Sequence, residues 1–318
     1  MAVAQSLQKK YEASATNMEA DHLSILPIRE EWGAPLVQYK KFWLKPSVVD
    51  GIMKLQVNFN ARHDDIILIS NPKCGTTWLK ALAFTVVNRD GVEDQSHPIR
   101  TCHPQELVKS IAIPPGGDLT YFDKLPSPRI LFTHTPFSLL PKSITDQGAR
   151  IVYICRDPKD AFVSRWHFQK KKIEGFNMEL DAAVNFFCEG FTSVGPFWDH
   201  CLEYWEQSIQ RPDKVLFLKY EDLVLETVKW VKVLAAFLGV PFTREEEDGG
   251  VPEEVVKLCS FDTLSGANQT GAVTSGIAKS AFFRKGKVGD WANHMTAEMG
   301  RKIDSTVGEK LKGSGLVF

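Results

Sequence analysis

The sequence predicts an α/β fold: a single domain in which a central parallel β-sheet is flanked by helices on both faces. Short β-branched runs alternate with longer segments in which apolar residues recur at helical spacing. The short runs are apolar on both sides, which is typical of parallel strands buried between two layers of helices. No stretch rich in Pro, Gly or Ser divides the chain, so one domain is expected.

The elements are expected to alternate along the chain, joined by right-handed crossovers. Four runs are predicted to be strands, namely IILIS (66–70), RILFT (129–133), RIVYIC (150–155) and KVLFLKY (214–220). Helices are predicted at 77–87, 159–172, 180–190, 196–209, 227–238, 253–258 and 296–311. Gly239 and Pro241 mark the end of one of them. In such sheets, ligands bind at the carboxyl ends of the strands.

The ends and loops of the chain are less regular. Residues 1–30 are expected to form a mobile tail, and 31–318 the folded domain. The polar, irregular region up to about residue 60 also carries aromatic residues, so its later part is expected to lie across the domain. Two predicted loops, 89–128 and 262–290, are long for a compact domain. Loops of that length usually serve a function or are mobile.

Composition excludes several classes of function. A net charge of −1 and a pI near 6.7 give no overall positive field for nucleic acid or an anionic membrane. No apolar run approaches the ~18 residues that cross a bilayer. The six cysteines include no CxxC pair and the N-terminus lacks the apolar core of a secretory signal, so a cytoplasmic setting is expected. An anionic ligand must therefore be held by local cations.

A first anion site is predicted in NPKCGTTW (71–78), which joins a predicted strand to a predicted helix. Free N–H groups and the positive end of the helix dipole face outward at such a junction. Gly75 allows close backbone approach, and Lys73 adds a positive charge. The hydroxyls of Thr76 and Thr77 add donors. An ordinary turn with a threonine N-cap and a solvated lysine also explains these residues. The motif is not Walker A, in which lysine follows glycine.

A second anion site is predicted in RDPKDAFVS (156–164), which follows the third strand. Asp157 is expected to cap the next helix, with proline at the first helical position. Arg156 then lies at the carboxyl end of the strand, and Ser164 in the second turn of the helix. A guanidinium group and a hydroxyl can hold one phosphate between them. Taken alone, such an arginine is more often an ion-pair partner, here of Asp157 or Asp160, and a serine at position 164 is more often a surface residue of the helix.

Together with RKGKVGDW (284–291), these segments resemble three motifs of the cytosolic sulfotransferases, which transfer a sulfuryl group from 3′-phosphoadenosine 5′-phosphosulfate (PAPS). The resemblance runs from about Trp32 to the C-terminus. It implies that the phosphosulfate is held by Lys73, Cys74, Gly75, Thr76, Thr77 and Trp78. It implies that the 3′-phosphate is held by Arg156, Ser164, Arg284, Lys285 and Gly286.

Two weaker matches concern the adenine of the donor. Tyr220, in KYEDL after the fourth strand, corresponds to a family tyrosine near the adenine. Cys259, Ser260 and Phe261, in CSFDTL, align with a family segment that borders it. Ordinary packing at a strand end or a helix end explains these residues as well.

The candidate base is His134, which follows the predicted strand 129–133 directly. An imidazole near its unperturbed pKa of ~6.5 can act as a general base at neutral pH. The stretch THTPF (133–137) resembles the family's TH-x-P segment, which implies that His134 is the catalytic base and that Lys73 stabilises the leaving phosphate. This scheme requires no metal, and no Asp/Glu pair or His/Cys cluster has metal-ligand spacing.

Some details indicate a plant-type member. The run that begins at Met295 is similar to plant soluble sulfotransferases. Animal members often carry a lysine two residues before the catalytic histidine, where this chain has Phe132. The segment 292–302 does not fit the dimer motif of many animal members, so a monomer is expected.

The acceptor is expected to be a small apolar molecule with a hydroxyl group: phenolic, steroid, jasmonate-like or terpenoid. Its pocket walls are expected from 32–43, the loop 89–128, the region of Phe137 and 176–187. Two alternatives stay open at this point. One is a P-loop-type phosphoryl transferase, and the other is a non-catalytic nucleotide- or hormone-binding relative.

Overall fold

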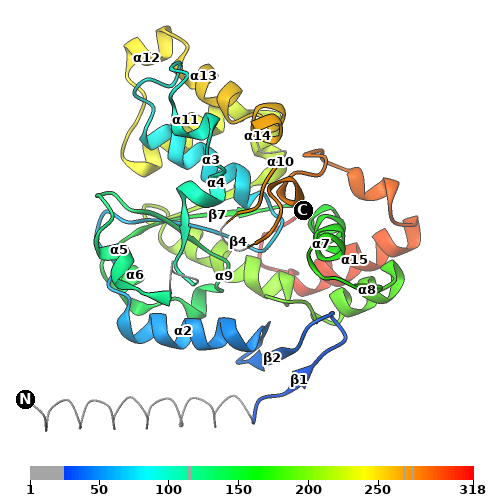
Figure 1. Cartoon of the computed structure of the whole chain (residues 1–318). Coiled ribbons are helices and arrows are strands. Elements are labelled where there is room, and N and C mark those ends of the chain that lie inside the picture. Colours follow the sequence, from blue (N-terminus) through cyan, green and yellow to red (C-terminus); the bar gives the residue numbers. More distant parts are fainter. Residues whose placement is uncertain (1–24, 113–116, 268–269, 274–275) are drawn as a thin grey trace, which may run out of the picture.

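The computed structural model describes residues 25–112, 117–267, 270–273 and 276–318, and a five-stranded parallel sheet lies at its centre (Figure 1). The strand order is β5-β6-β4-β7-β8. In that order the strands are β5 (Lys109–Ser110), β6 (Ile130–Thr133), β4 (Ile66–Ser70), β7 (Arg150–Cys155) and β8 (Val215–Lys219). The four longer strands confirm the four predicted runs.

Every helix predicted from the sequence is present, with its ends within two residues of the predicted ones. These helices are α3 (Thr76–Val87), α7 (Pro158–Lys172), α8 (Leu180–Cys188), α9 (Phe197–Gln210), α11 (Thr227–Leu238), α13 (Val251–Leu258) and α15 (Ala297–Lys310). The helices that the sequence did not predict include α6 (Lys142–Asp146), α10 (Tyr220–Leu225) and α12 (Arg244–Asp248).

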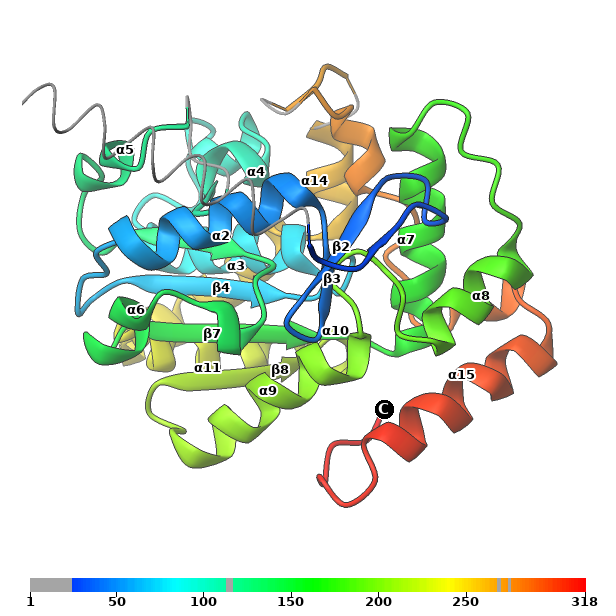
Figure 2. The same ribbon diagram turned by 90° about the horizontal axis from the view of Figure 1, so that it is seen from below.

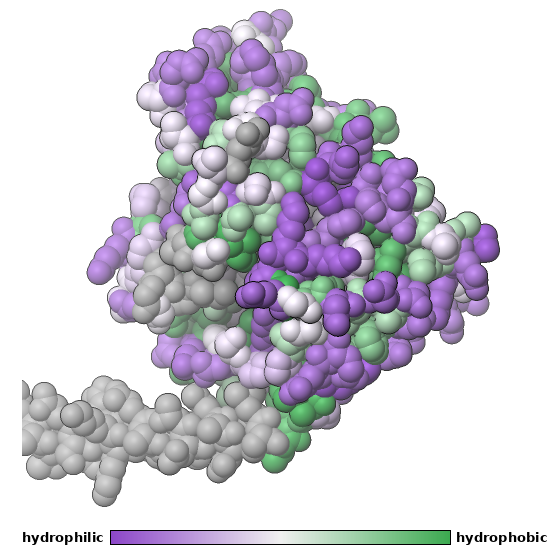
Figure 3. Space-filling view, turned by 45° about the vertical axis from the view of Figure 1, so that its right-hand side comes forward, coloured by the Kyte–Doolittle hydropathy of each residue, from purple (hydrophilic) through white to green (hydrophobic). Residues whose placement is uncertain are grey.

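The sheet separates two apolar clusters, because successive residues of a strand point to opposite faces. Ile67 and Ile69 of β4 pack with α9 and with α2 (Pro46–Asn58). Ile66 and Leu68 pack with α3 and α11 on the other face. Figure 2 shows these two pairs of helices on opposite sides of the sheet. On the face seen in Figure 3, hydrophilic side chains predominate and apolar ones form smaller patches. The predicted α/β fold class is confirmed.

The N-terminal part is more regular than predicted. Residues 1–24 of the predicted tail lie outside the described residues, but β1, β2 and β3 form an antiparallel sheet and α2 follows it. The turn between β2 and β3 consists of Lys40 and Lys41, and Lys40 has a φ of 53°. Such hairpin turns are usually signalled by Gly or Asn, so the sequence carried no sign of it. The strands are β1 (Ile28–Arg29), β2 (Leu36–Tyr39) and β3 (Phe42–Leu44).

Both predicted long loops contain short elements. The segment 89–128 holds β5 and two one-turn helices, and 262–290 begins inside a helix. Elements of this length are too short to show a helical or strand period, so the sequence could not reveal them. They are α4 (Pro104–Leu107), α5 (Thr120–Asp123), α14 (Phe261–Ala267) and the 3₁₀ turn η4 (Lys279–Phe282).

Candidate active site

One cavity of about 1160 Å³ lies at the carboxyl ends of β4, β6, β7 and β8. All but two of the predicted site residues line it. Those in the lining are Lys73, Gly75, Thr76, Thr77, Trp78, His134, Arg156, Ser164, Tyr220, Ser260, Phe261, Arg284, Lys285 and Gly286. The structure therefore brings together segments that are more than two hundred residues apart in the sequence, from Lys73 to Gly286.

The turn from β4 to α3 has the shape of an anion site. Gly75 is the N-cap of α3 with a φ of 106°, and Lys73 also has a positive φ of 76°. A Cβ atom on Gly75 would lie 2.9 Å from the Tyr220 ring, so only glycine fits there. Because no side chain caps α3 and its first turn has no acidic residue, its first N–H groups stay available. The threonine N-cap considered for an ordinary turn is thus not observed.

The two threonines differ in their surroundings. Thr76 is buried and its hydroxyl lies 2.5 Å from that of Ser70 at the end of β4. Thr77 accepts a hydrogen bond of 3.4 Å from the side-chain amide of Gln105. The Thr77 hydroxyl hydrogen is then free to be donated into the cavity.

Lys73 lies among other cations. Its ammonium group is 4.2 Å from the centre of the Phe168 ring, and no described carboxylate forms an ion pair with it. Burial, together with the charges of Arg156 and Arg284, lowers the pKa of Lys73 to about 7. A bound anion would supply the missing opposite charge.

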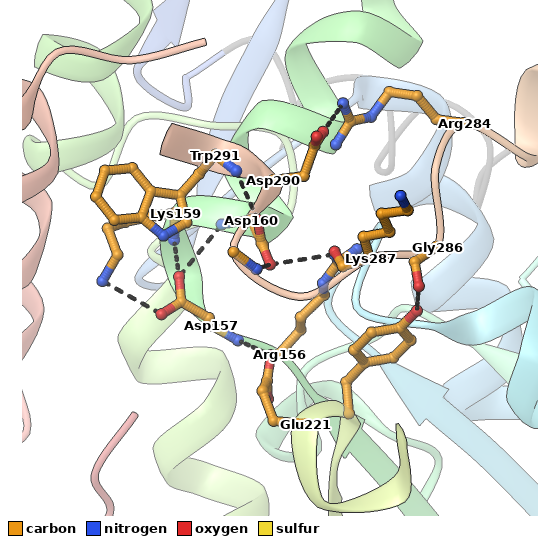
Figure 4. Close-up of polar contacts among 12 residues, drawn as sticks. Arg156, Asp157, Lys159, Asp160, Glu221, Arg284, Gly286, Lys287, Asp290 and Trp291 are labelled. Carbon is orange, nitrogen blue, oxygen red and sulfur yellow. Dashed lines mark hydrogen bonds and ion pairs between the residues drawn. The ribbon is translucent and has the colours of Figure 1, made fainter. Parts of the chain in front are cut away.

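Arg156 lies where β7 meets α7, as predicted. Asp157 caps α7 by accepting from the N–H groups of Lys159 and Asp160, at 2.8 and 3.2 Å. Arg156 is only 6% exposed and donates to Asp160 at 3.2 Å and to the carbonyl of Lys287 at 2.6 Å (Figure 4). Its Nε is buried and has no hydrogen-bond partner among the described residues. This donor is therefore available to a ligand.

Asp160 forms hydrogen bonds that hold the loop 284–291, which we call the C-terminal loop, at this site. Its carboxylate accepts from the N–H groups of Gly289 and Trp291, at 2.8 and 2.9 Å (Figure 4). The Tyr220 hydroxyl donates to the carbonyl of Gly286 at 3.1 Å. Arg284 forms an ion pair with Asp290, and its buried Nε has no partner among the described residues. Two arginines thus present unsatisfied buried donors at one place.

His134, at the end of β6, has a defined tautomer. Its Nδ1 lies 2.8 Å from the carbonyl oxygen of Ser70, so Nδ1 carries the proton and Nε2 is an acceptor. The main chain of His134 is itself fixed, because its carbonyl accepts from Nε2 of His200 at 3.0 Å. Burial lowers the pKa of His134 to about 3, well below the value of ~6.5 assumed from the sequence. The imidazole is therefore neutral at pH 7.

Two predicted residues, Cys74 and Cys259, do not reach the cavity. Both side chains are fully buried in the apolar clusters. The Cys259 thiol donates to the Thr85 hydroxyl at 3.3 Å, and the main-chain N–H of Cys74 donates to Asn71 at 3.3 Å. Burial raises the pKa of the Cys259 thiol to about 12. Core packing therefore keeps both side chains out of the lining, and the prediction that these two residues bind the donor stays a prediction.

Other residues at the site were not predicted. Arg165 and Gln105 line the cavity, and Lys80 is fully buried behind them on α3. Lys80 donates to the Gln105 side-chain oxygen and lies over the face of Phe132. A lysine at a core position of a mostly apolar helix is unusual, and this feature of the sequence could have identified Lys80.

The described residues contain no group of three or more His, Cys, Asp or Glu that could hold a metal ion. A search of the same residues finds no helix long and apolar enough to cross a membrane.

Comparisons with known proteins agree with this geometry. A model of the sulfotransferase domain matches residues 63–315. Cytosolic sulfotransferase 13 of Arabidopsis thaliana is 43% identical, over 93% of this chain and 92% of its own, and cytosolic sulfotransferase 16 is 41% identical, over 98% and 93%. The names of both relatives place them in the cytosol, in agreement with the predicted location.

Solved structures give the same result. A putative steroid sulphotransferase of Arabidopsis thaliana shares 38% identity, with a TM-score of 0.75 and 94% of each chain covered. A mouse sulfotransferase complexed with PAP shares 26% identity, with a TM-score of 0.68, covering 88% of this chain and 96% of the other. From the domain match, these relatives and the shared fold it follows that the chain is a plant-type member of the sulfotransferase family.

Proposed function

We propose that this protein transfers a sulfuryl group from PAPS to a hydroxyl group of a small acceptor, with His134 as the general base and Lys73 as the cation beside the leaving phosphate. The observation that carries this proposal is the cavity whose lining includes His134 together with Lys73 and Gly75 of one strand-to-helix turn and Arg156 of the other. The mouse relative, whose structure contains PAP, adds support for the nucleotide.

The lining fits a donor with two separate anionic groups. The turn after β4, with Lys73, Gly75 and Thr77, would hold the phosphosulfate. Arg156 and Arg284 each offer a buried Nε that has no partner among the described residues, as a site for a second phosphate requires. This second group of ligands would include Ser164, Lys285 and Gly286.

An aromatic part of the lining suits the adenine. The rings of Trp78 and Tyr220 are 5.5 Å apart at an interplanar angle of 69°. Phe261 is the first residue of α14, and a Cβ on Gly286 would come within 2.5 Å of its ring. Gly286 thus lets the loop pack against Phe261, and Ser260 completes the border.

The chemistry follows from the charges of the two catalytic groups. When bound, the donor supplies an activated sulfuryl group and its bisphosphate leaves. His134 Nε2 accepts the proton of the attacking hydroxyl, because Ser70 holds the proton of the ring on Nδ1. Lys73 stabilises negative charge on the leaving oxygen. A bound anion raises the pKa of both groups, so each holds a proton better in the complex than in the free protein.

The proposal is tested with labelled PAPS and a panel of phenols, hydroxysteroids and other hydroxylated acceptors. We expect transfer to at least one acceptor class and no transfer of phosphate from ATP. Phosphate transfer from ATP with no use of PAPS would establish the phosphoryl-transferase alternative. Binding of PAP without any transfer would establish the non-catalytic alternative.

We also propose that the protein acts as a monomer and without nucleic acid. The segment 292–302, which lacks the dimer motif, serves internal packing: Gly300 lies against the Trp291 ring, where a Cβ would come within 2.7 Å. Light scattering of the purified protein at assay concentration tests this, and a dimer mass contradicts it.

A further inference from the structure

The charges that line the cavity are of one sign. Among the described residues of the lining there is no Asp or Glu, although several Lys and Arg are present. Lys73, Arg156, Arg284 and Lys285 are accounted for by the two anionic groups of the donor. The cations that the donor does not explain are Lys45, Lys109, Arg165 and Lys172. Unpaired cations in a pocket repel one another, so their placement needs a reason.

Arg165 is the most constrained of these cations. It is only 7% exposed, and it donates through one terminal nitrogen to the carbonyl of Ser193. Its buried Nε has no hydrogen-bond partner among the described residues. Burial lowers the pKa of both His134 and Lys172, and the charge of Arg165 adds to each shift. A buried guanidinium with an unused donor calls for an acceptor atom.

Lys45 and Lys172 belong to segments far apart in sequence. Lys45 is the residue before α2, and Lys172 is the last residue of α7. Burial lowers the pKa of Lys172, and the positive charges of Lys45 and Arg165 lower it further. Neither lysine pairs with a described carboxylate, and the nearby Asp50 is taken by Lys54 at 2.8 Å. The three residues form a positive group at the cavity wall, which we call the Lys45–Arg165–Lys172 cluster.

The wall beside this cluster is apolar. Leu44, Val48 and Ile52 line the cavity next to Lys45, and Phe168 lines it one turn before Lys172. A ligand placed here therefore meets an apolar surface that ends in positive charge. That combination suits a molecule with an apolar body and one anionic group.

We propose that the acceptor carries a carboxylate in addition to its hydroxyl group, and that the Lys45–Arg165–Lys172 cluster binds this carboxylate. The inference rests on the proposed function and narrows the acceptor to hydroxylated carboxylic acids with an apolar body. Binding the carboxylate relieves the repulsion within the cluster and gives the Arg165 Nε an acceptor.

The test compares hydroxyaryl alkanoic acids of increasing chain length with their methyl esters, using labelled PAPS. Within each pair the ester carries one additional methyl group and lacks the negative charge of the acid. We expect at least one acid to exceed its ester about 10-fold in kcat/KM, mainly through KM, since charge-assisted hydrogen bonds give effects of that size. The Lys45→Met and Lys172→Met variants should each reduce this ratio, and Lys172→Glu should reverse it.

Lys170→Met is the matched control, because Lys170 lies on the same helix over the Trp166 ring and does not line the cavity. Its acid-to-ester ratio should equal that of the unmodified protein. Equal use of acids and esters, or an equal loss of preference in Lys170→Met, overturns the inference and leaves sulfuryl transfer standing.

Calorimetric titration of the acids into the PAP-loaded protein separates the two proposals. Acid binding that weakens in Lys45→Met supports the anion site even if no acceptor is sulfated, and in that case it is the proposed function that fails. Acids that bind no better than their esters count against the site.

Discussion

The two halves of the cavity are built in different ways. The half that we propose binds the donor contains Lys73, Thr77, Arg156 and Ser164, and we call it the donor half. It comes from two turns in which a strand of the sheet leads directly into a helix. The acceptor half combines α2, β5, the end of α7 and the strand end at His134, which are joined only by the fold. The donor half is therefore a product of local backbone geometry, and the acceptor half a product of tertiary packing.

This difference indicates which half of the cavity tolerates amino-acid substitutions. In the donor half, a substitution such as one at Gly75 disturbs the backbone itself, because Tyr220 fills the space beside it. In the acceptor half, side chains such as Ile52 and Lys172 belong to regular α-helices, whose backbone conformation does not require one particular residue. Single substitutions in the donor half should thus weaken donor binding, whereas substitutions in the acceptor half should change which acceptor is used.

The largest expected effect lies where the halves meet, at His134. His134→Ala removes the acceptor of the hydroxyl proton, so we expect kcat to fall about 10³-fold. Binding of PAP, measured by calorimetry, should change less than about twofold, because the phosphate ligands remain. His63→Ala is the control, since His63 is exposed and outside the cavity. A joint loss of turnover and PAP binding contradicts the assigned role.

A slightly smaller effect is expected at Lys73, in the donor half. Lys73→Met removes the cation proposed to stabilise the leaving oxygen, and kcat should fall about 10²- to 10³-fold. Lys257→Met, whose lysine is 75% exposed and pairs with Glu254, should retain full activity. If Lys73→Met raises only the KM for PAPS and keeps kcat, Lys73 binds the donor without acting on the chemical step.

Arg156 should affect affinity more than rate. Arg156→Gln removes a charged donor, so the Kd for PAP should rise about 10- to 100-fold, with a smaller change of kcat at saturation. Asp160 keeps its bonds from Gly289 and Trp291, so the C-terminal loop should stay in place. Arg244→Gln serves as the control, because that side chain is 91% exposed on α12. Unchanged PAP affinity in Arg156→Gln would show that Arg156 does not bind the phosphate.

The same contrast between local and tertiary structure explains what the sequence could reveal. The strand at 66–70, the Asp157 cap and the phosphate turns follow from periodicity and helix-end chemistry, which act over a few residues. The β2–β3 hairpin could not be predicted, because Lys40 adopts a positive φ without a glycine. The burial of the Cys74 and Cys259 side chains away from the cavity could not be predicted either, because position along the chain does not tell which way a side chain points.

Electrostatic properties were also beyond the sequence. The pKa of His134, about 3, depends on burial and on Lys80, His200 and Arg165, which approach it only in the fold. The buried amine of Lys80, held by Gln105 against Phe132, likewise depends on α4 and β6 meeting α3. Donor-half motifs gave positions of charge, but not the free-energy cost of burying that charge.

The smallest expected effect is the uptake of a proton when PAP binds. It reports the free-energy cost of burying the charge of Lys73. In the free protein the pKa of Lys73 is about 7, so at pH 8 its amine is mostly neutral. A bound polyanion raises that pKa, and PAP binding at pH 8 should therefore take up nearly one proton. Calorimetry in buffers of different ionisation enthalpy measures the number of protons, and Lys73→Met should bring it near zero.

The lowered pKa of Lys73 also determines how the free energy of unfolding changes with pH. Because the pKa of Lys73 is lowered in the folded state from 10.5, the unfolded chain holds more protons between about pH 7 and 10.5. The contribution of Lys73 to the free energy of unfolding therefore rises with pH across that window, and PAP should flatten the rise. Denaturant titrations at several pH values, with Lys73→Met as the reference, measure it. An identical pH dependence in the unmodified protein and in Lys73→Met would mean that the donor half carries no buried charge for PAP to neutralise. The contrast between the donor half and the acceptor half would then rest on backbone geometry alone.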